Sequence, residues 1–144
     1  MELGDIVELL NHEMASSLRI YRLLSACIAA VWLINGLWCK VLNQVPRHQE
    51  IVSRILGEEY ARPLTMAIGF GEIAIALWII SGYTFRLHAL LQIALVITMN
   101  CLEFILAPDL LLWGRLNLLF ALLFAGVVYF TFFMLRPKTD SRKR

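Results

Sequence analysis

Carboxylate, amide and amino groups stand within long apolar stretches of the chain, and they are the residues best suited to chemistry. Glu72 is the clearest, because it lies near the middle of the apolar run 63–81. A charge at the centre of a bilayer costs about 2.5–3.5 kcal/mol on insertion scales, and residues that bear this cost usually serve a function. The other apolar runs are interrupted by further polar residues, namely Asn35, Lys40, Asn100, Glu103 and Asn117.

The depth of these polar groups follows from the helical rise. With a rise of about 1.5 Å per residue, Glu72 lies near the middle of its run, and the others lie about 6–13 Å toward one side, the outer side. The inner half holds few comparable groups apart from His88 and Gln92. This asymmetry predicts a polar cavity that opens toward the outer face or the outer leaflet, with Glu72 at its floor. The alternative is a hydrogen-bond cluster that only clamps the helices together.

The position of Glu72 also predicts its protonation state. Removal from water disfavours the charged form of a carboxyl group. Lys40 could neutralise Glu72 or Glu103, but the helical rise puts it about 13 Å above Glu72, beyond direct contact unless its side chain reaches down or water bridges the two. We therefore expect Glu72 to be protonated, or to share a proton with Asn35 or Asn100, while the cavity is empty.

Cys39 and Cys101 lie at comparable depths in the outer halves of the first and third apolar runs. An oxidising face would permit a redox pair there, whereas a packing role is the alternative, because free cysteine often behaves as a small buried hydrophobic residue. The chain has no CxxC motif and no spacing typical of metal ligands, so the sequence predicts no metal site.

Four apolar runs must position these groups. The chain is 60% hydrophobic and 17% charged, against about 45–50% apolar and 25% charged residues in soluble domains. Residues 20–42, 63–81, 87–106 and 112–135 each provide the roughly 20 residues that a membrane span needs. The sequence therefore predicts an all-α integral membrane four-helix bundle. Gly69 and Gly71 would allow a neighbouring helix to approach, which would turn Glu72 inward.

The distribution of Lys and Arg predicts the orientation of the bundle. The side that holds both termini carries more of them near the span ends than the opposite side, so the positive-inside rule places the N- and C-termini in the cytoplasm. Net charge is only +2, without a grouped basic face, which gives no indication of nucleic-acid binding.

Two segments flank the spans on the cytoplasmic side. Residues 1–18 have an apolar stripe opposite acidic residues, which predicts a short amphipathic helix on a partner protein or on the bundle's own cytoplasmic face. The alternative is a loosely ordered terminus. Residues 137–144 form a basic cytoplasmic tail.

The first outer loop, residues 43–62, predicts an interfacial helix that lies over the outer mouth of the bundle. Pro46 can open this helix and Gly57 can close it. The polar face would carry a charge ladder made of Arg47, Glu50 and Arg54. A solvated loop is the alternative.

Several of these motifs resemble proteins of the DoxX-like family. The resemblance rests on VWLINGLWCK at residues 31–40, PRH at 46–48, IGFGE at 68–72 and Asn117 at the opening of the last run. It covers roughly residues 19–135, so that 19–136 would be a DoxX-like domain. The resemblance implies a four-helix bundle in a bacterial inner membrane. The family takes its name from a membrane subunit of a thiosulfate:quinone oxidoreductase.

The resemblance and the polar residues together lead to three functional hypotheses. The first is an accessory protein or membrane subunit of a quinone-linked redox system, with a quinone or a lipid as its ligand. The others are a scaffold for a partner enzyme and a small transporter. An autonomous enzyme is not expected, since no haem-ligating His pair lies within the spans. Partners besides the lipid bilayer would be another protein or further copies of the chain. The predicted ligand-binding residues are Glu72, Asn35, Asn100, Glu103, Asn117, Lys40, Arg47 and His48.

Overall fold

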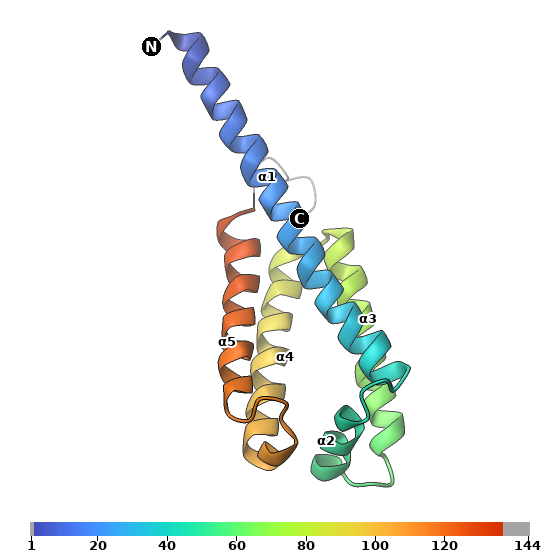
Figure 1. Ribbon diagram of the computed structural model, residues 1–144. Helices are drawn as coiled ribbons and strands as arrows, with labels where there is room; N and C mark the ends of the chain where they lie inside the picture. The colour runs from blue at the N-terminus through green and yellow to red at the C-terminus, as the bar shows by residue number, and fades with distance from the viewer. Residues whose placement is uncertain (1, 137–144) are drawn as a thin grey trace.

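The protein is a bundle of long helices, seen here in a computed structural model that describes residues 2–136. Four helical segments are long and apolar enough to cross a membrane, and the described range contains no strand. They alternate in direction, so that α1 starts and the last segment ends at the same end of the bundle (Figure 1). The chain is therefore an all-α integral membrane protein. The predicted basic tail, residues 137–144, lies outside the described residues.

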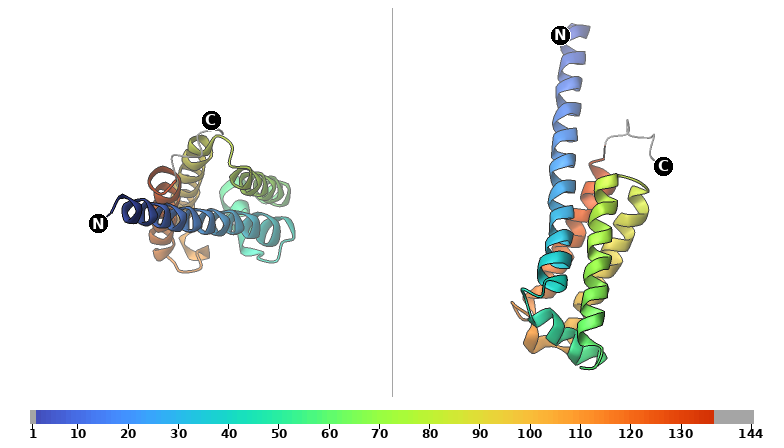
Figure 2. Two further views of the ribbon diagram at one scale, coloured as in Figure 1. Left: turned by 90° about the horizontal axis from the view of Figure 1, so that it is seen from above. Right: turned by 90° about the vertical axis from the view of Figure 1, so that its right-hand side faces the viewer.

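The first membrane segment is one helix with a widened end. Helix α1 (Leu3–Leu33) continues directly into the π-helix η1 (Ile34–Val41). Residues 3–18 are thus the first turns of α1, and they project beyond the bundle (Figures 1 and 2). Their apolar residues, including Leu3, Leu10 and Met14, are exposed. Packing on the bundle's own end, one of the two expectations for this segment, does not occur.

The other three segments follow the predicted runs closely. They are α3 (Ala61–Ser81), α4 (Phe85–Leu106) and α5 (Leu116–Tyr129), which continues into the π-helix η3 (Phe130–Met134). Gly82 ends α3 in the left-handed conformation at φ 65°, which glycine adopts without steric cost. The last span begins four residues later than predicted, because the 3-10 helix η2 (Pro108–Leu110) and a turn at Gly114 precede it.

Two pairs of helices make up the bundle. Helix α1 with η1 packs along α3, and α4 packs along α5. A methyl group added at Gly36 would lie 2.5 Å from the carbonyl oxygen of Gly69, so η1 and α3 meet backbone to backbone. The expectation for Gly69 is thus correct. The expectation for Gly71 is wrong, because this residue is exposed with no neighbouring atom near its absent side chain.

The predicted interfacial helix is present as α2 (Arg47–Leu56). It buries Ile51 and Val52, packs against α3, and lies with η2 at the end of the bundle opposite the chain termini (Figure 1). We call this the α2 end. The predicted charge ladder does not form. Instead, the Arg54 guanidinium pairs with the Asp109 carboxylate of η2 at 3.2 Å, which joins α2 to the connection between α4 and α5.

Candidate functional site

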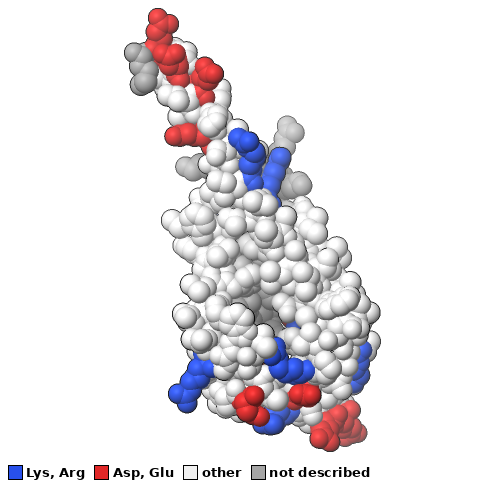
Figure 3. Space-filling view, in the orientation of Figure 1, with Lys and Arg blue, Asp and Glu red and all other residues white. Residues whose placement is uncertain are grey.

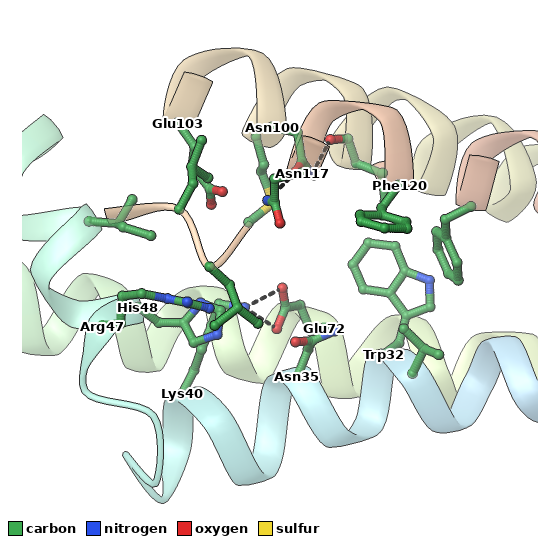
Figure 4. A pocket seen from close by; sticks show the side chains of 17 residues that line it. Trp32, Asn35, Lys40, Arg47, His48, Glu72, Asn100, Glu103, Asn117 and Phe120 are labelled. Carbon is green, nitrogen blue, oxygen red and sulfur yellow. Dashed lines mark hydrogen bonds and ion pairs between the residues drawn. The ribbon is translucent and has the colours of Figure 1, made fainter. Parts of the chain in front are cut away.

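A cavity of about 450 Å³ lies between the two helix pairs, near the α2 end (Figure 4). This size is typical of pockets that hold a small ligand. The structure brings together at this cavity all eight residues that the sequence predicts to bind ligand, although they come from five different helices. They are Asn35, Lys40, Arg47, His48, Glu72, Asn100, Glu103 and Asn117.

Lys40 and Glu72 form a buried ion pair at the wall of the cavity. The Lys40 Nζ atom lies 2.8 Å from both carboxylate oxygens of Glu72 (Figure 4). Lys40 is 4% exposed and Glu72 is 5% exposed. The exception allowed for Lys40 therefore applies, because its side chain reaches Glu72 directly. A count of helical rise gives only the depths of the backbones, and the two side chains span the remaining distance.

The π-helix η1 places Lys40 in this position. Widened helical turns of this kind often occur at functional sites, and the last carbonyl groups of a helix have no intrahelical partner. The Arg62 guanidinium of α3 donates to the carbonyl oxygens of Lys40 and Val41, each at 2.7 Å. Sequence analysis did not single out Arg62. The signal was available in retrospect, because Arg62 opens the helix that carries Glu72.

The amides on the opposite wall are partly satisfied. Asn117 donates to the side-chain oxygen of Asn100 at 3.0 Å, and Asn100 donates to the carbonyl oxygen of Val96 at 2.9 Å. These bonds join α5 to α4. Asn35 lies beside Glu72 on the other wall (Figure 4) and makes no side-chain hydrogen bond within residues 2–136. No hydrogen bond joins Asn35 or Asn100 to Glu72 among the described residues.

The mouth near α2 carries charged groups that have no partner among the described residues. Arg47 and His48 face Glu103 across the cavity (Figure 4). The Arg47 Nε atom is buried without a hydrogen bond. Burial, reinforced by the charges of Lys40 and Arg47, lowers the pKa of His48 to about 4, so its imidazole is neutral at pH 7. The cavity thus offers unused donors and acceptors on facing walls.

Cys39 and Cys101 are both partly buried free thiols. Neither belongs to the residues that line the cavity. Their pairing under oxidising conditions stays a prediction.

Sequence analysis missed a second polar cluster, which adjoins the cavity. The Trp32 indole N–H donates to the Gln92 side-chain oxygen at 2.8 Å, and the Gln92 amide nitrogen lies 3.0 Å from His88 Nδ1. We call these three residues the Trp32 chain. All three are buried. His88 also packs edge-on against the rings of Trp78 and Phe132. Sequence position placed His88 and Gln92 in the inner half of the bundle, and tertiary contacts bury both of them in its interior.

Four long apolar helices enclose a polar cavity beside a buried ion pair, so the chain is a multi-pass membrane protein with an internal pocket. The sequence profile of the DoxX-like family matches residues 29–129. The chain therefore belongs to the DoxX-like family. No curated protein and no solved structure matches it. The matched range includes Asn35, Lys40, Glu72 and Asn117, and it also includes Arg62 and the Trp32 chain.

Proposed function

We propose that this protein is an accessory protein or membrane subunit of a quinone-linked redox system, and that its cavity binds a small lipophilic ligand. The observation that carries this proposal is the set of polar groups around the cavity that lack partners. Asn35, Arg47 and Glu103 make no side-chain hydrogen bond within the described residues, although all three line the cavity. Of these groups, the Arg47 Nε atom is buried without a partner. Buried polar groups are normally satisfied, so this atom supports a bound acceptor, and the partly exposed side chains of Asn35 and Glu103 offer further contacts to a ligand.

The Lys40–Glu72 ion pair would orient this ligand. An ammonium group has three N–H donors, and Glu72 takes two of them. The third can donate to a carbonyl oxygen of the ligand, such as that of a quinone. Glu103 is an acceptor for a ligand hydroxyl on the facing wall, and it can hold a proton released there. The neutral imidazole of His48 can serve as donor or acceptor beside Arg47.

We also propose that the termini lie in the cytoplasm, so that the α2 end and the cavity face outward across a bacterial inner membrane. Basic side chains lie at the base of the projecting helix (Figure 3). By sequence, the side of the termini holds eight of the thirteen Lys and Arg residues, four of them in the tail 137–144, and this excess supports the orientation. Reporter fusions at Met1 and Arg144 test it. Activity of an external reporter at either terminus would show that this terminus lies outside the cytoplasm and would contradict the proposed orientation.

The second candidate function is a scaffold for a soluble enzyme. It is favoured by the projecting part of α1, whose apolar residues Leu3, Leu9 and Leu10 are more than half exposed. Such a surface suits a protein partner better than water. Acidic residues share this segment (Figure 3), which argues against binding to anionic lipids.

Purification from membranes in a mild detergent separates the two functions. We expect solvent extraction and mass spectrometry to recover a quinone or another single lipophilic compound in near-stoichiometric amount. The double substitution Lys40→Met with Glu72→Leu should abolish this recovery. Gln92→Leu is the matched control, because it removes a buried polar group outside the cavity. If the wild-type protein carries no such compound but copurifies with a stoichiometric soluble enzyme, the ligand-binding function is rejected and the scaffold function is supported.

A further inference from the structure

The walls of the cavity are unequal, and the gap between α1 and α5 is its weakest side. Helix α3 closes one side, because Gly36 and Gly69 bring η1 and α3 into backbone contact. The hydrogen bond between Asn100 and Asn117 joins α4 to α5 on another side. At the α2 end, Ile51 and Leu111 are less than 10% exposed, and both line the cavity.

The gap between α1 and α5 is different, because residues there face both the cavity and the surroundings of the bundle. Val31 of α1 is 40% exposed and Phe120 of α5 is 43% exposed, yet both line the cavity. The space-filling view shows a hollow on this lateral face, with uncharged residues above and beside it and Lys or Arg atoms at its lower edge, toward the α2 end (Figure 3). The residues at this height belong to membrane spans, so the hollow faces lipid tails.

The lining of the cavity changes from polar to apolar along the bundle. Lys40, Arg47 and Glu103 lie toward the α2 end, whereas the rings of Trp32 and Phe120 lie toward the other end (Figure 4). The polar groups at the α2 end therefore suit a polar head, and the gap suits an apolar chain. A volume of about 450 Å³ matches a drug-sized molecule, and the gap between Val31 and Phe120 provides room for one chain to leave it.

We infer that the ligand is a single-chain amphiphile that enters sideways from the bilayer, and that its apolar chain lies in the gap between α1 and α5. This inference rests on the proposed function and adds the chemical class of the ligand and its route. The head would contact the Lys40–Glu72 pair. The chain would pass Val31 and Phe120 to reach the lipid phase.

Photolabelling of the protein in nanodiscs tests the position of the chain. The probe is a decyl-substituted benzoquinone with a diazirine either beside its ring or midway along its chain. We expect the ring diazirine to label residues near Lys40 and Glu72, and the chain diazirine to label residues 28–32 and 120–124. An excess of unlabelled decylbenzoquinone should prevent both. Labelling by the chain diazirine within residues 43–62 would overturn the lateral route and leave the proposed function intact.

A matched pair of substitutions tests the gap itself. Val31→Phe narrows it, whereas Val127→Phe adds the same bulk at a residue that is 42% exposed and does not line the cavity. We expect Val31→Phe to weaken decylbenzoquinone binding by about tenfold, as overpacking of a filled site would, and to leave the binding of chainless dimethoxybenzoquinone unchanged. Val127→Phe should affect neither. Equal loss of both probes in Val31→Phe would overturn the inference, and failure of wild type to bind either would overturn the proposed function as well.

Discussion

The bundle contains two polar clusters that meet at Trp32 and differ in how completely their groups are satisfied. In the Trp32 chain, each hydrogen bond joins a donor to an acceptor, and only His88 Nε2 is left without a partner. In the cavity, the Lys40–Glu72 pair is satisfied, but Arg47, Glu103 and Asn35 are not. Trp32 belongs to both clusters, since it lines the cavity and donates its N–H to Gln92.

This difference distinguishes a clamp from a binding site. Polar groups that satisfy one another within a sealed interior hold helices together and need no further molecule. Polar groups that surround an open volume and keep unused donors and acceptors can exchange partners with a ligand. The Trp32 chain therefore fits the description of a clamp. Around Glu72, the bond between Asn100 and Asn117 also joins two helices, and it is the unused groups of Asn35 and Glu103 that favour the proposed binding site over a clamp alone.

The largest expected effect comes from breaking the buried ion pair. Glu72→Leu leaves the Lys40 ammonium buried without a counter-ion, which should lower the free energy of unfolding by about 3–5 kcal/mol. Glu72→Gln should also destabilise, because a neutral amide does not balance the charge. The double substitution with Lys40→Met should restore stability to near that of wild type. Denaturation in detergent measures all three, and an additive double variant would show that the pair contributes no coupling.

Acidification should destabilise the protein through His48, which α2 places at the mouth of the cavity. The pKa of His48 is lowered from 6.5 to about 4 in the folded protein, so the folded state binds fewer protons than the unfolded state between these values. The stability contributed by neutral His48 is complete above about pH 6.5 and is lost as the pH falls toward 4, by up to about 3 kcal/mol. A His48→Gln variant should lack this slope in melting curves recorded across the same pH range. An equal slope in both proteins would assign the effect to another group.

Breaking the Trp32 chain should cost less and leave the cavity groups in place. Gln92→Leu removes the acceptor of the Trp32 N–H and the partner of His88 Nδ1, which should destabilise the protein by about 2 kcal/mol. Binding of decylbenzoquinone should change by less than about threefold, because the head contacts lie elsewhere. Loss of binding comparable to that of the Lys40→Met and Glu72→Leu double variant would place the Trp32 chain in the site and remove the contrast between the two clusters.

The smallest effect is expected at the exposed ion pair between α2 and η2. The side chains of Arg54 and Asp109 are 49% and 60% exposed, and pairs of this kind contribute about 0–1 kcal/mol. Arg54→Ala should therefore change the melting temperature little, and raised salt should reduce even that change. A large loss would mean that the attachment of α2 depends on this contact more than on the burial of Ile51 and Val52.

Most of the fold could be predicted from hydropathy and from breaks between apolar runs. The three later spans and α2 lie close to their predicted ranges, because an apolar run of sufficient length has few alternatives in a bilayer and Pro46, Gly57 and Gly82 interrupt the helices locally. The continuity of residues 3–18 with the first span was not predicted. No proline or glycine pair separates the two parts, so the helix has no local reason to end.

For the candidate site, the participating residues could be predicted from the sequence, whereas their contacts could not. Sequence alone predicts a polar cavity formed by Asn35, Lys40, Glu72, Asn100, Glu103 and Asn117, since polar groups at membrane depth avoid lipid. Their partners depend on tertiary contacts. The Lys40–Glu72 pair depends on the backbone contact between Gly36 and Gly69, on the widened turn of η1 and on Arg62. These features join residues far apart in the chain, and side-chain reach and helix spacing are not encoded in the periodicity of any single span.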